Sequence, residues 1–220
     1  MERLPSFLVL SLFLLSAVLL VGCGSGIATV DDRDYLRQGG SYKEEVLFDG
    51  RRIGLHEMVF TAGDTAGDIL EITLKSRADD AGGPKQITST RSEYDREGNF
   101  IRAVGTIWTR ASGLTTEFTT PEGTPEGPAA VTVSLLRRPL EVGERRTVVF
   151  YDLFRQTTVQ MEMSGRDHVR VGSRRLLRVD AKLIAGQYTQ TLRAYCDARG
   201  HTIRTDLDVS GKTMTIQRTP

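Results

Sequence analysis

The main pattern along the chain is an alternation of apolar and polar residues that recurs from Tyr42 to Ile216. A clear example is the run in which Val159, Met161 and Met163 alternate with polar neighbours. Successive side chains of a β-strand point to opposite faces of a sheet, so a period of two predicts half-buried strands. The runs are of strand length and the intervals between them are of turn length.

Turn-forming residues between the runs predict hairpins. Asp49-Gly50 separates Tyr42–Phe48 from Arg52–Phe60, and both turn residues tolerate the positive φ of a two-residue turn. A second hairpin is expected to join Ile87–Tyr94 and Asn99–Trp108. Parallel strands would need helical crossovers, which this pattern does not show. The sequence therefore predicts an all-β domain, an antiparallel meander that forms a curled sheet, a half-barrel or a two-layer sandwich.

The middle of the chain interrupts this series. Thr115–Thr119 is expected to be a short strand, and the prolines and glycines of segment 121–128 predict an exposed loop. Val131–Leu136 then resumes an apolar run of strand length, before a second break at 137–144. No helix is predicted between the first strand and the last.

The N-terminus carries a different pattern, a continuous apolar stretch after a short charged start. This arrangement predicts a signal helix, with a signal peptide at residues 1–22. The residues at its end resemble the lipobox of bacterial lipoproteins, in which the signal peptidase recognises apolar and small residues before an acylated cysteine: Leu20, Val21, Gly22 and Cys23. An uncleaved transmembrane anchor is the alternative, because about 20 apolar residues span a bilayer.

The lipobox resemblance implies that acyl chains on Cys23 hold the protein to a membrane. We therefore expect it in the cell envelope, facing the periplasm or the exterior, and Gly24 in place of a retention aspartate favours the outer membrane over the inner. Residues 23–40 are polar and predict a flexible tether, with a short helix at Asp32–Gln38 as the alternative. The β domain is expected to occupy 41–220.

The balance of charged residues limits the classes of partner that the protein could bind. The 29 basic and 28 acidic residues give a net charge of +1, without the basic excess that nucleic-acid binding needs. Arginine supplies 24 of the basic residues and forms adjacent pairs that could hold lipid head groups or cell-wall carboxylates. Ordinary surface ion pairs explain the same count. The pairs begin at Arg51, Arg137, Arg145 and Arg174.

No motif for catalysis, a metal or a cofactor is present in the sequence. His56, His168 and His201 lack the close spacing of a metal site and are expected at solvated positions or turn edges. Cys196 follows Leu192 and Ala194 in the same alternating phase, which predicts a small buried side chain rather than a reactive thiol. We therefore expect no enzyme and no cofactor.

Two functions fit these features. The first is a binding or envelope-organising module whose partner is an envelope protein or cell-wall material. The second is a carrier of lipid or another apolar ligand, in the manner of the curved sheets of lipoprotein-sorting factors. Its apolar face would include Met161, Met163, Leu177 and Val179, although the same side chains would equally form a closed core.

Turn motifs of the β domain resemble the uncharacterised β domains of bacterial envelope proteins, some of which precede transglutaminase-like domains. Those domains have a Gly-x-x-x-Gly-Tyr motif that joins the first two strands, a Pro-Leu-x-x-Gly-Glu motif at the start of the second half, and an Asp-x-x-Gly turn before the last strands. The resemblance implies a non-catalytic β module and supplies no binding residues. The matching positions are Gly50 and Gly54, with Leu55 in place of an aromatic residue, then Pro139, Leu140, Gly143 and Glu144, then Asp197 and Gly200.

Overall fold

The computed structural model describes residues 34–62, 70–80, 82–95 and 97–219. The predicted signal peptide, the lipobox residues and Cys23 lie outside the described residues, as does most of the predicted tether. Among the described residues, no helix has the length and apolar character needed to cross a membrane.

The described chain forms one antiparallel sheet of twelve strands, which confirms the predicted all-β meander. Each strand pairs with its neighbour in sequence, except that β6 and β7 are the two edges and β1 pairs with β12. The first half consists of β1 (Gly40–Phe48), β2 (Arg51–Thr61), β3 (Leu70–Asp80), β4 (Gly83–Tyr94), β5 (Phe100–Thr109) and β6 (Thr115–Thr119). The second half consists of β7 (Arg145–Asp152), β8 (Thr157–Val171), β9 (Arg174–Ala185), β10 (Tyr188–Cys196), β11 (Thr202–Val209) and β12 (Lys212–Arg218).

The predicted hairpins and their turns are present. Asp49 and Gly50 have φ of 52° and 78°, the left-handed values that a tight turn between β1 and β2 requires. Strands β4 and β5 pair as expected, and β6 has the predicted limits. The alternation of apolar and polar residues, together with the turn residues, is therefore sufficient to locate these hairpins.

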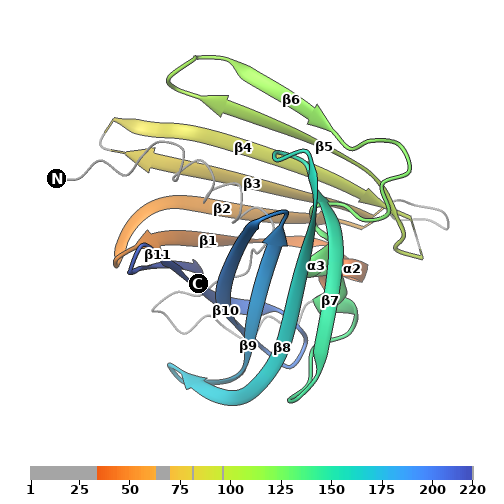
Figure 1. The fold of residues 1–220 in the computed structure, drawn as a ribbon, viewed down its shortest axis with the longest axis vertical. Coiled ribbons are helices and arrows are strands. Elements are labelled where there is room, and N and C mark those ends of the chain that lie inside the picture. Colours follow the sequence, from red (N-terminus) through yellow and green to blue (C-terminus); the bar gives the residue numbers. More distant parts are fainter. Residues whose placement is uncertain (1–33, 63–69, 81, 96, 220) are drawn as a thin grey trace.

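The sheet curls, so that its two halves enclose one core. Figure 1 shows β1–β6 running across the view and β7–β10 running along it, with the helices between the two halves. The edges β6 and β7 share no hydrogen-bonded ladder, so the barrel-like shape stays open. Side chains cover the gap instead: the rings of Phe118 and Phe154 meet edge to face at 5.7 Å, and Leu153 packs where a Cβ on Gly105 would lie.

Helix α3 (Ala130–Arg137) corrects the expectation that Val131–Leu136 resembles the strand runs. The segment lies between the two sheet edges, where a strand would leave backbone groups without a partner, whereas a helix satisfies them internally. Val131, Val133 and Leu135 are all buried in the core, so tertiary packing overrides the strand preference of the valines.

Helix α2 (Tyr35–Gln38) lies within the range predicted as a tether and matches the alternative of a short helix there. The Asp34 carboxylate accepts a hydrogen bond from the backbone N–H of Arg37 at 3.3 Å and so caps the helix. Tyr35 is fully buried against the rings of Tyr42 and Phe60. The ordered contacts of the domain therefore begin before β1.

Candidate functional site

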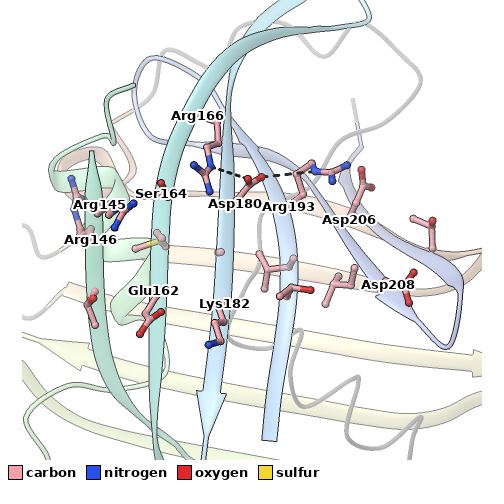
Figure 2. Close-up of a pocket in the computed structure, with 17 residues that line it drawn as sticks. Arg145, Arg146, Glu162, Ser164, Arg166, Asp180, Lys182, Arg193, Asp206 and Asp208 are labelled. Carbon is pink, nitrogen blue, oxygen red and sulfur yellow. Dashed lines mark hydrogen bonds and ion pairs between the residues drawn. The ribbon is translucent and has the colours of Figure 1, made fainter. Parts of the chain in front are cut away.

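A groove of about 840 Å³ lies over β7–β11 and is lined mainly by charged side chains (Figure 2). Its size falls within the usual range of ligand sites, about 300–1,000 Å³. The basic residues that line it are Arg145, Arg146, Arg166, Lys182 and Arg193. The acidic residues are Glu162, Asp180, Asp206 and Asp208.

The groove is on the face of the sheet opposite the core, as strand alternation dictates. On β8, Met161 and Met163 point into the core while Glu162, between them, is exposed. On β9, Val179 is buried and the adjacent Asp180 faces the groove. The outward positions of several neighbouring strands therefore combine into one polar surface.

A bend in β8 helps to shape this surface. The pairing of β8 with β9 shifts between Gly165 and His168, and a bulge of this kind bends a strand and increases its twist. Figure 1 shows β8 curving along its length. Gly165 also exchanges two backbone hydrogen bonds of 2.9 Å with Gly143 and Glu144, and a Cβ at Gly165 would overlap the carbonyl oxygen of Glu141. Only glycine fits this close approach.

Arg146 lies behind the basic end, in the inward phase of β7 and opposite Met163. Its guanidinium donates to the carbonyl oxygens of Ser134 at 3.0 Å and Arg138 at 2.6 Å, and to the Glu144 carboxylate at 2.9 Å. The hydrogen bond from Arg146 lowers the pKa of Glu144, which therefore stays ionised. Arg146 thus joins the C-terminal end of α3 to β7, while Arg145 is exposed beside it.

The centre of the groove has one carboxylate among several guanidinium groups. Asp180 accepts a hydrogen bond from Nε of Arg166 at 2.9 Å, and Nε of Arg193 lies 3.9 Å away (Figure 2). Arg178 adds a third contact to Asp180 at 3.5 Å. Arg178 also lies 3.4 Å from Asp167, so three guanidinium groups face two carboxylates, and the excess positive charge would favour a further anionic group.

The opposite end, on β11, is acidic. Asp206 accepts hydrogen bonds from Thr215 and Arg204, both at 2.8 Å. Asp208 is exposed and accepts one hydrogen bond from the turn N–H of Gly211 at 3.1 Å. Figure 2 shows these two carboxylates on the far side of Asp180 from Arg145 and Arg146. The groove therefore has a basic end and an acidic end.

The predicted apolar ligand face lies in the core. Met161, Met163, Leu177 and Val179 are at most 5% exposed and pack in one cluster with α3 residues such as Val133. The carrier hypothesis requires that a ligand reach these side chains. Their packing in this structure is that of core residues.

The structure places only some of the potentially reactive residues, the cysteine and the histidines, where the sequence analysis expects them. Cys196 is buried as predicted, and burial raises the pKa of its thiol to about 12. His168 is exposed and His201, although buried, lies at the edge of the 197–200 turn, whereas His56 is buried within β2, which corrects the expectation of a solvated or turn-edge position for that residue. His201 lies 2.9 Å from the Asp197 carboxylate. In the described part of the chain, no three potential metal ligands come together.

The groove itself was not predicted. Its residues come from separate strands and meet only because the strands are neighbours in the sheet. The adjacent arginines Arg145 and Arg146 were a partial signal of the groove. The alternation in β8 and β9 marked which charged side chains face outward, but it did not show which of them lie next to each other in the folded sheet.

The fold and the groove define a class: a barrel-like antiparallel β protein with a charged outer surface. No family model and no curated protein matches the sequence. Among solved structures, the chain is similar to a β-barrel-like protein of the domain of unknown function DUF1849 from Brucella abortus. The TM-score is 0.54 at 10% identity, over 84% of this chain and 97% of that one. At this identity the similarity shows a shared fold alone.

Two further solved structures are more distant. A protein described as exported, with a YmcC-like fold, from Bacteroides fragilis has a TM-score of 0.39 at 10% identity, over 83% of this chain and 95% of that one. A protein described as a lipoprotein from Parabacteroides distasonis has a TM-score of 0.39 at 8% identity, over 83% and 94%. None of these descriptions supports the expected link to domains that precede transglutaminase-like domains.

Proposed function

We propose that this chain is a membrane-anchored extracytoplasmic lipoprotein whose β domain is a non-catalytic binding module, with the groove of Figure 2 as its binding surface. The observation that carries the proposal is the separation of charge along a hollow of about 840 Å³. The lipobox resemblance that ends at Cys23 supports the anchor and the envelope location.

The charges suit a partner with both an anionic and a cationic group. A carboxylate would be held by Arg166 and Arg193, and an ammonium group by Asp206 and Asp208. Peptide segments of envelope proteins and of the cell wall carry both groups. The burial of the predicted apolar face supports this module over a carrier of apolar ligands.

The groove can be tested by capture of envelope material on the full-length, detergent-solubilised protein, with bound species identified by mass spectrometry. Reversal of charge in Arg193→Glu should reduce capture about tenfold, because it replaces an attractive contact with a repulsive one. Lys75→Glu is the matched control, since Lys75 is exposed on β3 in the other half of the sheet. Equal capture by both variants would contradict the proposal.

The anchor is tested separately. Cys23→Ser removes the thiol that would carry the acyl chains, so the variant should remain unprocessed or leave the membrane fraction. The mature wild-type protein should begin at Cys23 and carry the mass of its acyl chains. A wild-type mass without an acyl increment would exclude lipidation and leave the groove proposal standing.

A further inference from the structure

Strand β7 is an edge of the sheet, and part of its backbone points away from the only strand it pairs with, β8 (Figure 1). The N–H of Tyr151 donates to the carbonyl oxygen of Glu126 at 2.9 Å, on the side opposite β8. Backbone groups alternate in direction along an antiparallel strand, so the residues two and four positions before Tyr151 point the same way. Thr147 and Val149 therefore direct their N–H and C=O groups outward from the sheet edge.

A hollow of about 440 Å³ adjoins these outward groups. Thr147, Val148 and Val149 line it on the side of β7, and Ala130 and Val133 line it on the side of α3. The two α3 residues are buried and give the hollow an apolar floor, while Val149 is 43% exposed. Open space therefore lies beside backbone groups that can still form hydrogen bonds.

The outward part of β7 is also suited by composition to pairing with another strand. Proline, lysine and bulges protect many edge strands. Segment 147–151 contains threonine, valine, phenylalanine and tyrosine, all of which favour strands, and its ladder with β8 has no register shift. The other edge, β6, is only five residues long, whereas β7 has eight. Of the two edges, β7 is therefore the better template for an added strand.

The charge at the hollow indicates the kind of strand. Three arginines and one glutamate line it: Arg137, Arg138, Arg146 and Glu126. Glu144 contacts both Arg138 and Arg146, and the Arg137 guanidinium donates to a backbone carbonyl oxygen at 2.9 Å. Positive charge exceeds negative charge, so carboxylates are attracted to this edge. A second copy of the chain would bring an equally positive edge against it, which is unfavourable.

We propose that an extended peptide segment with acidic side chains binds at β7 and adds a strand to the sheet. Main-chain hydrogen bonds to Thr147 and Val149 would supply affinity, as in other cases of strand addition. Alternate side chains of the peptide would lie against α3 on one face and beside the exposed Arg145 on the other. This site uses the edge of the sheet and adjoins the groove of Figure 2 at Thr147, but it does not depend on the groove.

The first test follows hydrogen exchange of single amides in the full-length, detergent-solubilised protein. The probe is a peptide with blocked ends and the sequence Glu-Val-Thr-Val-Glu-Val-Thr. Without the peptide, Thr147 and Val149 should exchange quickly and Val148 slowly, because only the Val148 amide bonds to β8. Saturating peptide should slow exchange of the first two about tenfold or more, whereas Glu117, an outward residue of β6, should not change. Unaltered exchange at Thr147 and Val149 would overturn the proposal.

The second test removes one outward N–H. Val149→Pro deletes a donor that the β8 ladder does not use, and proline is tolerated on the outer side of an edge strand. The variant should keep the unfolding temperature of wild type and bind the peptide about tenfold more weakly or worse. Glu117→Pro, the matched change on the β6 edge, should bind it as wild type does. A folded Val149→Pro variant with full affinity would contradict strand addition.

Two further measurements identify the occupant and separate this site from the groove. A peptide with lysine in place of glutamate should bind about tenfold more weakly, and equal binding would contradict the acidic preference. Slow exchange of Thr147 and Val149 that appears without peptide and increases with protein concentration would show a second copy at the edge and exclude the peptide. Arg193→Glu should lose capture in the groove test and keep its response to the acidic peptide, so either proposal can fail alone.

Discussion

Gly165 determines the course of β8 by the absence of a side chain. Its backbone lies against the carbonyl oxygen of Glu141 and exchanges hydrogen bonds with Gly143 and Glu144. The strand bends at this position, in the half of the sheet that carries the groove. A single methyl group would therefore disturb both the bend and the connection from α3 to β7.

Gly165→Ala should lower the free energy of unfolding by about 1–3 kcal/mol, because the new Cβ overlaps backbone that cannot move without breaking those hydrogen bonds. Urea denaturation of the detergent-solubilised protein measures the change. Ser164→Ala, at the adjacent groove position, should stay within about 0.5 kcal/mol of wild type. Equal stability of wild type and Gly165→Ala would show that β8 is not held as described.

Individual residues also show where sequence analysis stops. His56 falls in the same phase as Met58 and Phe60, so the alternation alone could have placed it in the interior. The expectation of a solvated or turn-edge position rested on the absence of metal-site spacing among the histidines. His56 is buried together with its register partners Glu44 and Ser76, and register is not visible in one sequence.

At the scale of elements, the ladder between β4 and β5 contains a strong side-chain pair. Arg102 donates two hydrogen bonds to the Glu93 carboxylate, at 2.8 and 3.0 Å, and the two residues are register partners. The hydrogen bonds from Arg102 lower the pKa of Glu93 below its ordinary 4.5. The pair is therefore an electrostatic link between two strands of the first half.

This link should depend on pH. Because the pKa of Glu93 is lower in the folded state than in the unfolded state, its contribution is present above pH 4.5 and is lost as the pH falls through the folded value. Glu93→Gln should cost about 1 kcal/mol at neutral pH and show a smaller acid loss than wild type. Urea titrations at neutral and acidic pH measure both effects, and parallel pH profiles would contradict this assignment.

The elements that the sequence predicted and the one that it missed have a common explanation. Hairpins form from neighbouring residues, so alternation and turn residues such as Asp49-Gly50 are sufficient to locate them. Helix α3 depends instead on its position between two sheet edges, which only the folded chain defines. Val131–Leu136 is an apolar run of strand length in the sequence, and that length suggested a strand.

At the scale of the whole molecule, the curled sheet is closed by side chains where β6 and β7 fail to pair. Phe154, after β7, contacts Phe118 on β6, and the adjacent Leu153 contacts β5. Backbone hydrogen bonds hold every other junction of the meander. The contact between β6 and the β7–β8 turn is therefore the place where the barrel-like shape can open at least cost.

Phe154→Ala should destabilise the fold by about 1–3 kcal/mol, less than a fully buried Phe, because the ring is only partly buried. Hydrogen exchange should quicken in β5 and β6 more than in β9 and β10, since those two strands lose their lateral support. Val142→Ala, which truncates an exposed apolar side chain outside this contact, is the control. Uniform acceleration across all strands would indicate global destabilisation without local opening.

The pairing of β1 with β12 has a consequence for how the chain folds. Val46 and Ile216 meet at this seam and are both fully buried, so the first of the described strands is completed by the last of them. Until β12 has paired with it, β1 has an unpaired edge that can pair with another unfolded chain. The pairing of β1 with β12 is therefore a late step in folding. Chaperones that hold the polypeptide extended would protect the edge of β1 until then.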